Sequence, residues 1–117
     1  MIKRRQSNGR LSHIVEYPLA GSVVVISGQV AENRDLDITG QTKDVLSLVE
    51  RLLAEAGTSK ERLISAQIWL PDINDFDAMN AVWDGWVSKD NPPARACVES
   101  RLADPRLKIE VQVWALK

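Results

Sequence analysis

The clearest β-strand in this 117-residue chain is Leu63-Ile64-Ser65-Ala66-Gln67-Ile68-Trp69-Leu70. Within it, Ile64, Ala66, Ile68 and Leu70 alternate with Ser65, Gln67 and Trp69, so that one face is apolar and the other is mixed. An apolar strand face has to be buried against another layer of secondary structure. We therefore expect a sheet that is covered on one side.

Helical periodicity appears on both sides of this strand. Before it, apolar residues recur at the spacing of one helical face and predict a helix over 38–56: Ile38, Val45, Val49, Leu52, Leu53 and Ala56. Asp37 or Thr39 can cap its start, and Gly57 stands where a helix ends. After the strand, Phe76, Met79, Trp83, Trp86 and Val87 predict a second helix over 74–87, with Asn74 available as its N-cap.

The remaining elements are predicted to be strands. Residues 11–17 and 22–27 are rich in β-branched residues and are separated by the turn cluster Pro18–Gly21, which favours a β-hairpin. A further strand is expected at 2–6, and two more at 94–101 and 107–116. The order β-β-α-β-α-β-β predicts one α+β domain over residues 1–117. It would be a two-layer sandwich with a five- to six-stranded mixed sheet and both helices on one face.

Composition excludes several classes of function. The chain has 44% hydrophobic and 26% charged residues, as ordinary soluble globular domains do. All 16 acidic residues follow the basic first ten, so we expect no bulk attraction to nucleic acid or to an anionic membrane. One cysteine and one histidine leave too few ligands for a zinc or iron–sulfur site, and we expect neither a metal nor another cofactor. Without a membrane span or secretory signal, the expected location is cytoplasmic.

The uncovered face of the sheet carries the chemistry. If the apolar side of every strand faces the helices, the other face displays Gln67, Trp69, Arg95, Cys97, Glu99, Glu110, Gln112 and Trp114. Tryptophans on an open face predict self-association. In a cleft at such an interface the Arg95 guanidinium can bind a small carboxylate, and Glu110 on a neighbouring strand can position water or shuttle a proton. The alternative is a structural Arg–Glu ion pair.

Two motifs resemble the RidA/YjgF family of reactive-intermediate (enamine and imine) deaminases: Pro92-Pro93-Ala94-Arg95-Ala96-Cys97-Val98-Glu99 and Lys108-Ile109-Glu110-Val111. Further family-like pieces are Ser27-Gly28-Gln29, Gln41-Thr42, Ala54-Glu55-Ala56-Gly57 and Asn74-Asp75-Phe76. The stretch Asn80-Ala81-Val82-Trp83-Asp84-Gly85-Trp86-Val87 looks most like the YoaB-like branch. The resemblance implies a chorismate-mutase-like fold and a trimeric barrel with sites between subunits.

The resemblance also implies roles for individual residues. Arg95 would bind the substrate carboxylate, main-chain groups at Cys97 would help to hold the substrate, and Glu110 would position the hydrolytic water. Ser27 and Asn80 are carried over as further substrate-binding residues. The implied reaction is cofactor-free hydrolysis of small 2-imino or enamine acids to 2-oxo acids and ammonia. The chain departs from the family pattern at Ile14, where many members have a tyrosine.

Two alternative functions stay open. The first is a regulatory trimer that binds small carboxylates without catalysis, which would keep Arg95 but not need Glu110. The second is an endoribonuclease or translation inhibitor, and the net acidity beyond residue 10 argues against it. Cys97 as a nucleophile is disfavoured because the only histidine, His13, is far away in the sequence.

Overall fold

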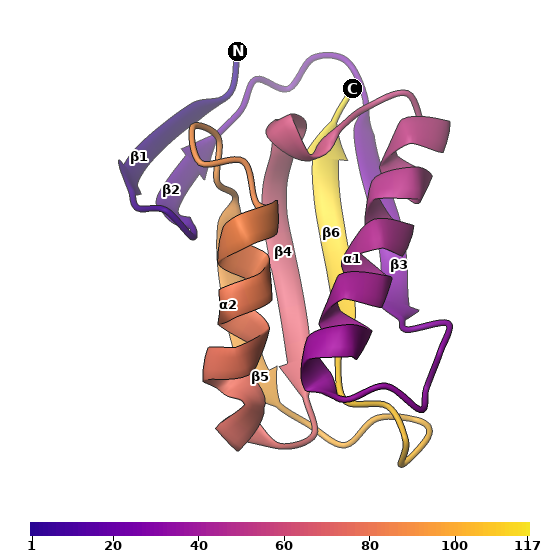
Figure 1. The fold of residues 1–117 in the computed structure, drawn as a ribbon. Helices are drawn as coiled ribbons and strands as arrows, with labels where there is room; N and C mark the ends of the chain where they lie inside the picture. Colours follow the sequence, from indigo (N-terminus) through magenta and orange to yellow (C-terminus); the bar gives the residue numbers. More distant parts are fainter.

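The computed structural model describes residues 1–117 and contains six strands and two α-helices (Figure 1). In chain order these are β1 Lys3–Ser7, β2 Ser12–Glu16, β3 Val23–Val30, α1 Ile38–Glu55, β4 Leu63–Leu70, α2 Phe76–Trp86, β5 Ala94–Glu99 and β6 Glu110–Leu116. Short 3₁₀ turns at Lys60–Arg62 and Ile73–Asp75 precede β4 and α2. Neither α-helix is long and apolar enough to cross a membrane.

The main sheet has the strand order β3-β6-β4-β5, with β4 and β5 parallel and the other pairs antiparallel. Parallel neighbours need a crossover, which α2 provides between β4 and β5. Figure 1 shows α1 and α2 side by side on one face of this sheet, while the opposite face carries no helix. The predicted two-layer α+β sandwich with a mixed sheet is confirmed, but the expected five- to six-stranded sheet is divided into this four-stranded sheet and a separate two-stranded sheet of β1 and β2.

The core forms between the two helices and the sheet, as the periodicities predict. A cluster of 16 buried residues joins α1, α2 and strands β3, β4 and β6, and its member Trp83 is fully buried; from β5 only Cys97 packs against this cluster. Asp37 is the N-cap of α1, where its side chain accepts a 2.8 Å hydrogen bond from the Gly40 backbone N–H. Gly57 follows the helix with φ +86°, a left-handed conformation that glycine adopts without strain.

The predicted hairpin between residues 11–17 and 22–27 is wrong. The strand β2 pairs with β1 in a separate two-stranded sheet, and β3 pairs with β6. The turn that closes the β1–β2 hairpin is at Asn8-Gly9, where the Asn8 side chain accepts hydrogen bonds from the backbone N–H groups of Arg10 and Leu11. Asn-Gly is a strong hairpin signal, and it outweighs the Pro18–Gly21 cluster.

Two finer predictions also need correction. Asn74 does not cap α2; it lies in the preceding 3₁₀ turn, where the Asp72 side chain accepts from its backbone N–H. On β5, the mixed-face assignment is inverted. Arg95 pairs with Ala66 and Cys97 with Ile68, so they share the helix-covered face with these two core residues. The open face of β5 instead carries Ala94, Ala96 and Val98.

Candidate anion-binding site on the edge strand

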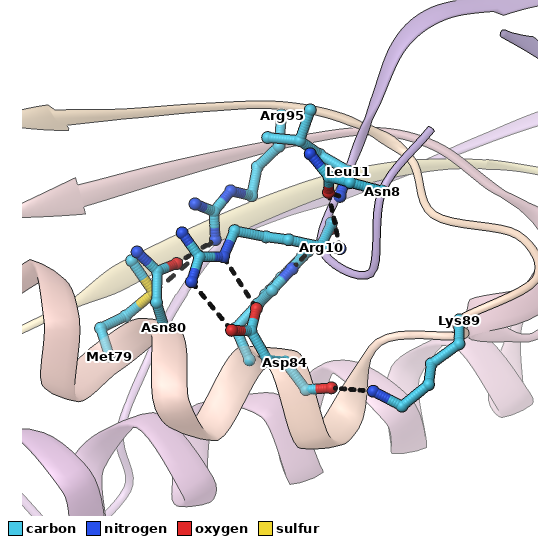
Figure 2. Close-up of polar contacts among 9 residues, drawn as sticks. Asn8, Arg10, Leu11, Met79, Asn80, Asp84, Lys89 and Arg95 are labelled. Atoms are coloured by element: carbon cyan, nitrogen blue, oxygen red, sulfur yellow. Dashed lines mark hydrogen bonds and ion pairs between the residues drawn. The ribbon is translucent and has the colours of Figure 1, made fainter. Parts of the chain in front are cut away.

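Arg95 lies on the edge strand β5, and its side chain reaches over α2 (Figure 2). Its Nη1 donates a 2.7 Å hydrogen bond to Asn80 Oδ1 and lies 3.9 Å from Met79 Sδ. Its guanidinium carbon lies 5.1 Å from the centre of the Trp83 ring, a cation–π distance. Because Trp83 and Asn80 are buried in the core, the guanidinium is held in one place at the edge of the sheet.

This half-buried guanidinium has no carboxylate partner, since none of the six ion pairs in the chain includes Arg95. Its Nε is buried without a hydrogen-bond partner, and so is Nδ2 of the neighbouring Asn80. A buried donor left unpaired costs about 1–3 kcal/mol. Two such donors beside an unpaired cation suit an acceptor that comes from outside the chain.

Groups around Arg95 shift its pKa in both directions. Burial lowers the pKa of Arg95, Cys97 and Asp84 oppose this shift, and the positive charge of Arg10 adds to it. A guanidinium nevertheless stays protonated in proteins. The group is therefore a permanent cation that is partly removed from water.

Cys97 follows Arg95 by two residues on the same strand face, and its side chain packs against the core. Burial raises the pKa of the Cys97 thiol, and the charge of Arg95 opposes this shift only in part. A raised pKa disfavours the thiolate, which is the nucleophilic form. His13 lies exposed on β2. These observations give no support to thiol catalysis, and the backbone role expected for Cys97 stays a prediction.

Glu110 is the first residue of β6 and points to the face that carries no helix, opposite to its buried neighbour Val111. Its carboxylate lies directly over Gly28 of β3, so that a Cβ atom at position 28 would overlap Oε2. The β3–β6 register breaks at this point, between Ile26 and Gln29. The break contains Ser27, which is exposed. Ser27 and Glu110 thus belong to the same end of the β3–β6 pair.

The structure does not place Arg95 and Glu110 on neighbouring strands, as the sequence-based interpretation had it. Strand β4 lies between β5 and β6, and the two side chains point to opposite faces of the sheet. The candidate residues therefore form two groups within one chain. Arg95, Cys97 and Asn80 lie at the β5 edge on the helix side, and Ser27 and Glu110 lie on the open face near β3.

The open face itself is strongly apolar. Val23, Val25 and Val98 are 49%, 54% and 45% exposed. The predicted positions of Trp69 and Trp114 on this face are confirmed, and both are partly exposed. Exposed apolar residues on one face of a sheet are typical of interaction surfaces.

Arg10 and Asp84 are polar residues next to this site that the motif analysis did not single out (Figure 2). Arg10 binds Asp84 through two 2.8 Å hydrogen bonds, from Nε to Oδ1 and from Nη2 to Oδ2. The bond from Arg10 lowers the pKa of Asp84 and raises that of Arg10. The Asn8-Gly9 turn, which brings Arg10 back toward β5, is the sequence signal that could have located this pair.

The chain is thus an α+β sandwich with an arginine at the sheet edge that has no carboxylate partner. No group of three or more His, Cys, Asp or Glu side chains is arranged to hold a metal ion. The chain belongs to the RidA/YjgF family: residues 1–117 match the family model described as Endoribonuclease L-PSP. The resemblance inferred from the two motifs is confirmed.

Individual relatives agree with this assignment. A RutC family protein of Haemophilus influenzae is 39% identical over 115 residues, which cover 97% of each chain. RutC family protein YoaB of Escherichia coli is 38% identical over 86 residues, covering 74% of this chain and 75% of that one. The 2-iminobutanoate/2-iminopropanoate deaminase of Escherichia coli is 27% identical over 104 residues, covering 83% and 81%. A solved YjgF-family structure from Neisseria meningitidis has a TM-score of 0.80 and 40% identity, covering 100% and 95%.

Proposed function

We propose that this protein hydrolyses small 2-imino acids, and the enamine acids that tautomerise to them, to 2-oxo acids and ammonia. The observation that carries the proposal is the half-buried Arg95, which has no carboxylate partner and has an unpaired Nε. Such a guanidinium fits a small carboxylate, because its planar donors match two oxygen atoms. The named activity of the Escherichia coli deaminase among the relatives supports the same substrate class.

In the proposed reaction Arg95 binds the substrate carboxylate, and Asn80 holds Arg95 in place through the 2.7 Å hydrogen bond. Backbone groups at Cys97 would align the bound acid. Glu110 accepts a proton from water while the water oxygen bonds to the imine carbon. Glu110 gives this proton to the imine nitrogen, which completes a neutral carbinolamine. Glu110 then takes the proton of the carbinolamine hydroxyl and passes it to the nitrogen, so that ammonia leaves as the C–N bond breaks and the C=O bond forms. The imine carbon is already electrophilic, so the reaction needs no cofactor.

The site is proposed to lie between two copies of the chain in a homotrimer. Within one chain, Arg95 and Glu110 point to opposite faces of the sheet with β4 between them. A second copy that covers the apolar open face would bring its own Glu110 and Ser27 to the β5 edge of the first. The 49–54% exposure of Val23 and Val25 supports such a contact, because burying them is favourable at about 25 cal/mol per Å².

The test is the release of 2-oxobutyrate from 2-iminobutyrate, generated by an amino acid oxidase in the presence of semicarbazide as a competing trap. We expect the wild type to outpace the trap and both Arg95→Met and Glu110→Gln to lose this acceleration. Arg101→Met, an exposed arginine just beyond β5, serves as the matched control and should retain it. If Glu110→Gln turns over like the wild type, the proposed catalytic role of Glu110 is wrong.

The same variants separate the alternative functions. A regulatory carboxylate-binding trimer predicts that the wild type binds 2-oxobutyrate in calorimetry but does not accelerate hydrolysis. The endoribonuclease description of the family model predicts RNA cleavage that stays with the protein through purification. For the deaminase, we expect Glu110→Gln to bind 2-oxobutyrate as the wild type does while losing turnover.

A further inference from the structure

The loop between β1 and β2 places a second arginine beside Arg95 (Figure 2). Asn8 shapes this loop by accepting from the backbone N–H of Arg10, and the Trp83 indole N–H donates a 3.0 Å hydrogen bond to the Arg10 carbonyl. The Arg10 side chain then binds both oxygen atoms of Asp84. Arg10 is therefore held through both its backbone and its side chain. The Trp83 indole that binds the Arg10 carbonyl also stacks against the Arg95 guanidinium.

Asp84 is within electrostatic reach of both arginines. Asn80 and Asp84 are four residues apart on α2, so they lie on the same helix face one turn apart. Asn80 binds Arg95 and Asp84 binds Arg10. Figure 2 shows the Arg10 guanidinium between the Arg95 guanidinium and the Asp84 carboxylate, and the charge of Arg95 lowers the pKa of Asp84.

We propose that Arg10 is a positioning residue that sequesters the Asp84 carboxylate and thereby keeps the Arg95 guanidinium free for the carboxylate of an incoming acid. The inference rests on the proposed function, in which Arg95 receives a substrate carboxylate. Without Arg10, two cations remain near Asp84: Lys89, whose Nζ already donates to the Asp84 backbone carbonyl, and Arg95, whose charge acts on the carboxylate more strongly than that of Lys89. A carboxylate on the same chain competes with a dissolved acid at a high effective concentration, so the pairing of Asp84 with Arg95 would block the site.

The charges support this role. Arg10 and Asp84 neutralise each other, which leaves one net positive charge at Arg95. A single substrate carboxylate balances that charge. The negative charge of Asp77 on α2 also raises the pKa of Arg10, which favours the charged form of Arg10 beside this helix.

The test is a calorimetric measurement of 2-oxobutyrate binding to the assembled protein and its variants. We expect Arg10→Met to raise the dissociation constant about tenfold or more, because Asp84 then competes for Arg95. Adding Asp84→Asn to Arg10→Met should bring the constant back to within about threefold of wild type, a non-additivity that only a shared interaction produces. A merely structural role predicts that the double variant binds no better than Arg10→Met, and this result would overturn the proposal.

Two further variants serve as controls for the binding measurement. Arg5→Met removes the exposed Arg5–Glu16 ion pair on the same hairpin and should bind 2-oxobutyrate like the wild type. Arg10→Lys keeps a cation for Asp84 and should lie between the wild type and Arg10→Met, so that it tests the proposal if Arg10→Met does not fold. Wild-type-like binding by Arg10→Met, in a folded protein, would contradict the proposal.

A second readout separates this inference from the proposed function. If the wild type fails to bind 2-oxobutyrate, the proposed function is wrong, and carboxyl ¹³C NMR of Asp84 still tests the role of Arg10. We expect the Asp84 carboxyl in Arg10→Met to titrate below its ordinary pKa, because Arg95 takes the place of Arg10. Adding Arg95→Met should then raise the Asp84 pKa, and Lys89, which is the same in both variants, cannot cause that difference. An equal Asp84 pKa in Arg10→Met and in Arg10→Met with Arg95→Met would overturn the inference.

Discussion

Gln41 is the buried amide that joins the loops at one end of the sheet, and we expect Gln41→Leu to lower the free energy of unfolding by about 3–4 kcal/mol. Its side chain on α1 is fully buried. Nε2 donates to the backbone carbonyls of Arg34, Leu36 and Arg106 at 3.1, 3.0 and 2.9 Å. Oε1 accepts from the Lys108 backbone N–H at 2.9 Å. These bonds hold the chain that leads into β6 and Glu110.

The expected loss of unfolding free energy follows from the number of hydrogen bonds that the substitution removes. Leucine fills a similar volume but removes the two hydrogens that Nε2 shares among three carbonyls and the one bond that Oε1 accepts, at about 1 kcal/mol or slightly more for each of these three hydrogen bonds. The assay is urea denaturation followed by tryptophan fluorescence, at one fixed protein concentration because subunit association contributes to stability. Lys43→Leu, an exposed position on the same helix, is the control and should change stability by less than about 0.5 kcal/mol. A loss below about 1 kcal/mol for Gln41→Leu would refute this reasoning.

Three further predictions follow from the site and its surroundings. Gly28→Ala should fold with a similar melting temperature but lose imine hydrolysis, because its Cβ displaces the Glu110 carboxylate; unchanged turnover would contradict that geometry. Hydrogen bonds from Arg106 lower the pKa of Asp104, so its stabilising effect is present above the ordinary pKa of 3.8 and is lost as pH falls through the folded value. Denaturation of Asp104→Asn should therefore differ from wild type at pH 7 and converge with it in strong acid, whereas a constant difference would argue against this link. Val25→Asp on the open face should reduce the sedimentation mass from three times 13.1 kDa to that of one chain, and an unchanged mass would place the subunit contact elsewhere.

Periodicity predicted the elements that pack on both sides of the core. The α1 helix and β4 follow their expected ranges because apolar residues recur there at the period of a helix or of a strand. The Asp37 cap and the Gly57 terminus were also predictable, since their backbone demands are local.

The face of β5 was not predictable from polarity alone. Arg95 packs its aliphatic stem and its guanidinium against Trp83, so that a charged residue occupies the helix side. The apolar residues Ala96 and Val98 point to the open face. The alternation in β5 is therefore misleading, because a charged residue that stacks on a core tryptophan lies on the covered face and apolar residues lie on the open face.

The separation of Arg95 and Glu110 could not be predicted from sequence spacing either. The insertion of β4 between β5 and β6 is a matter of strand order, which local patterns do not specify. The motifs nevertheless identified Arg95 and Asn80, which the structure joins by a hydrogen bond. The Arg10–Asp84 pair was missed because its partners are 74 residues apart, and the family-like stretch that contains Asp84 does not indicate which residue it binds.

The most direct measurement is complementation between two inactive variants. Co-expressed with different affinity tags and purified for both, Arg95→Met and Glu110→Gln chains form mixed oligomers in which some sites combine an intact Arg95 from one copy with an intact Glu110 from another. Every trimer that carries both tags has one such site among its three, so about a third of the sites should regain 2-iminobutyrate hydrolysis, while each variant alone stays inactive. Mixed oligomers as inactive as the separate variants would contradict a site shared between two copies of the chain.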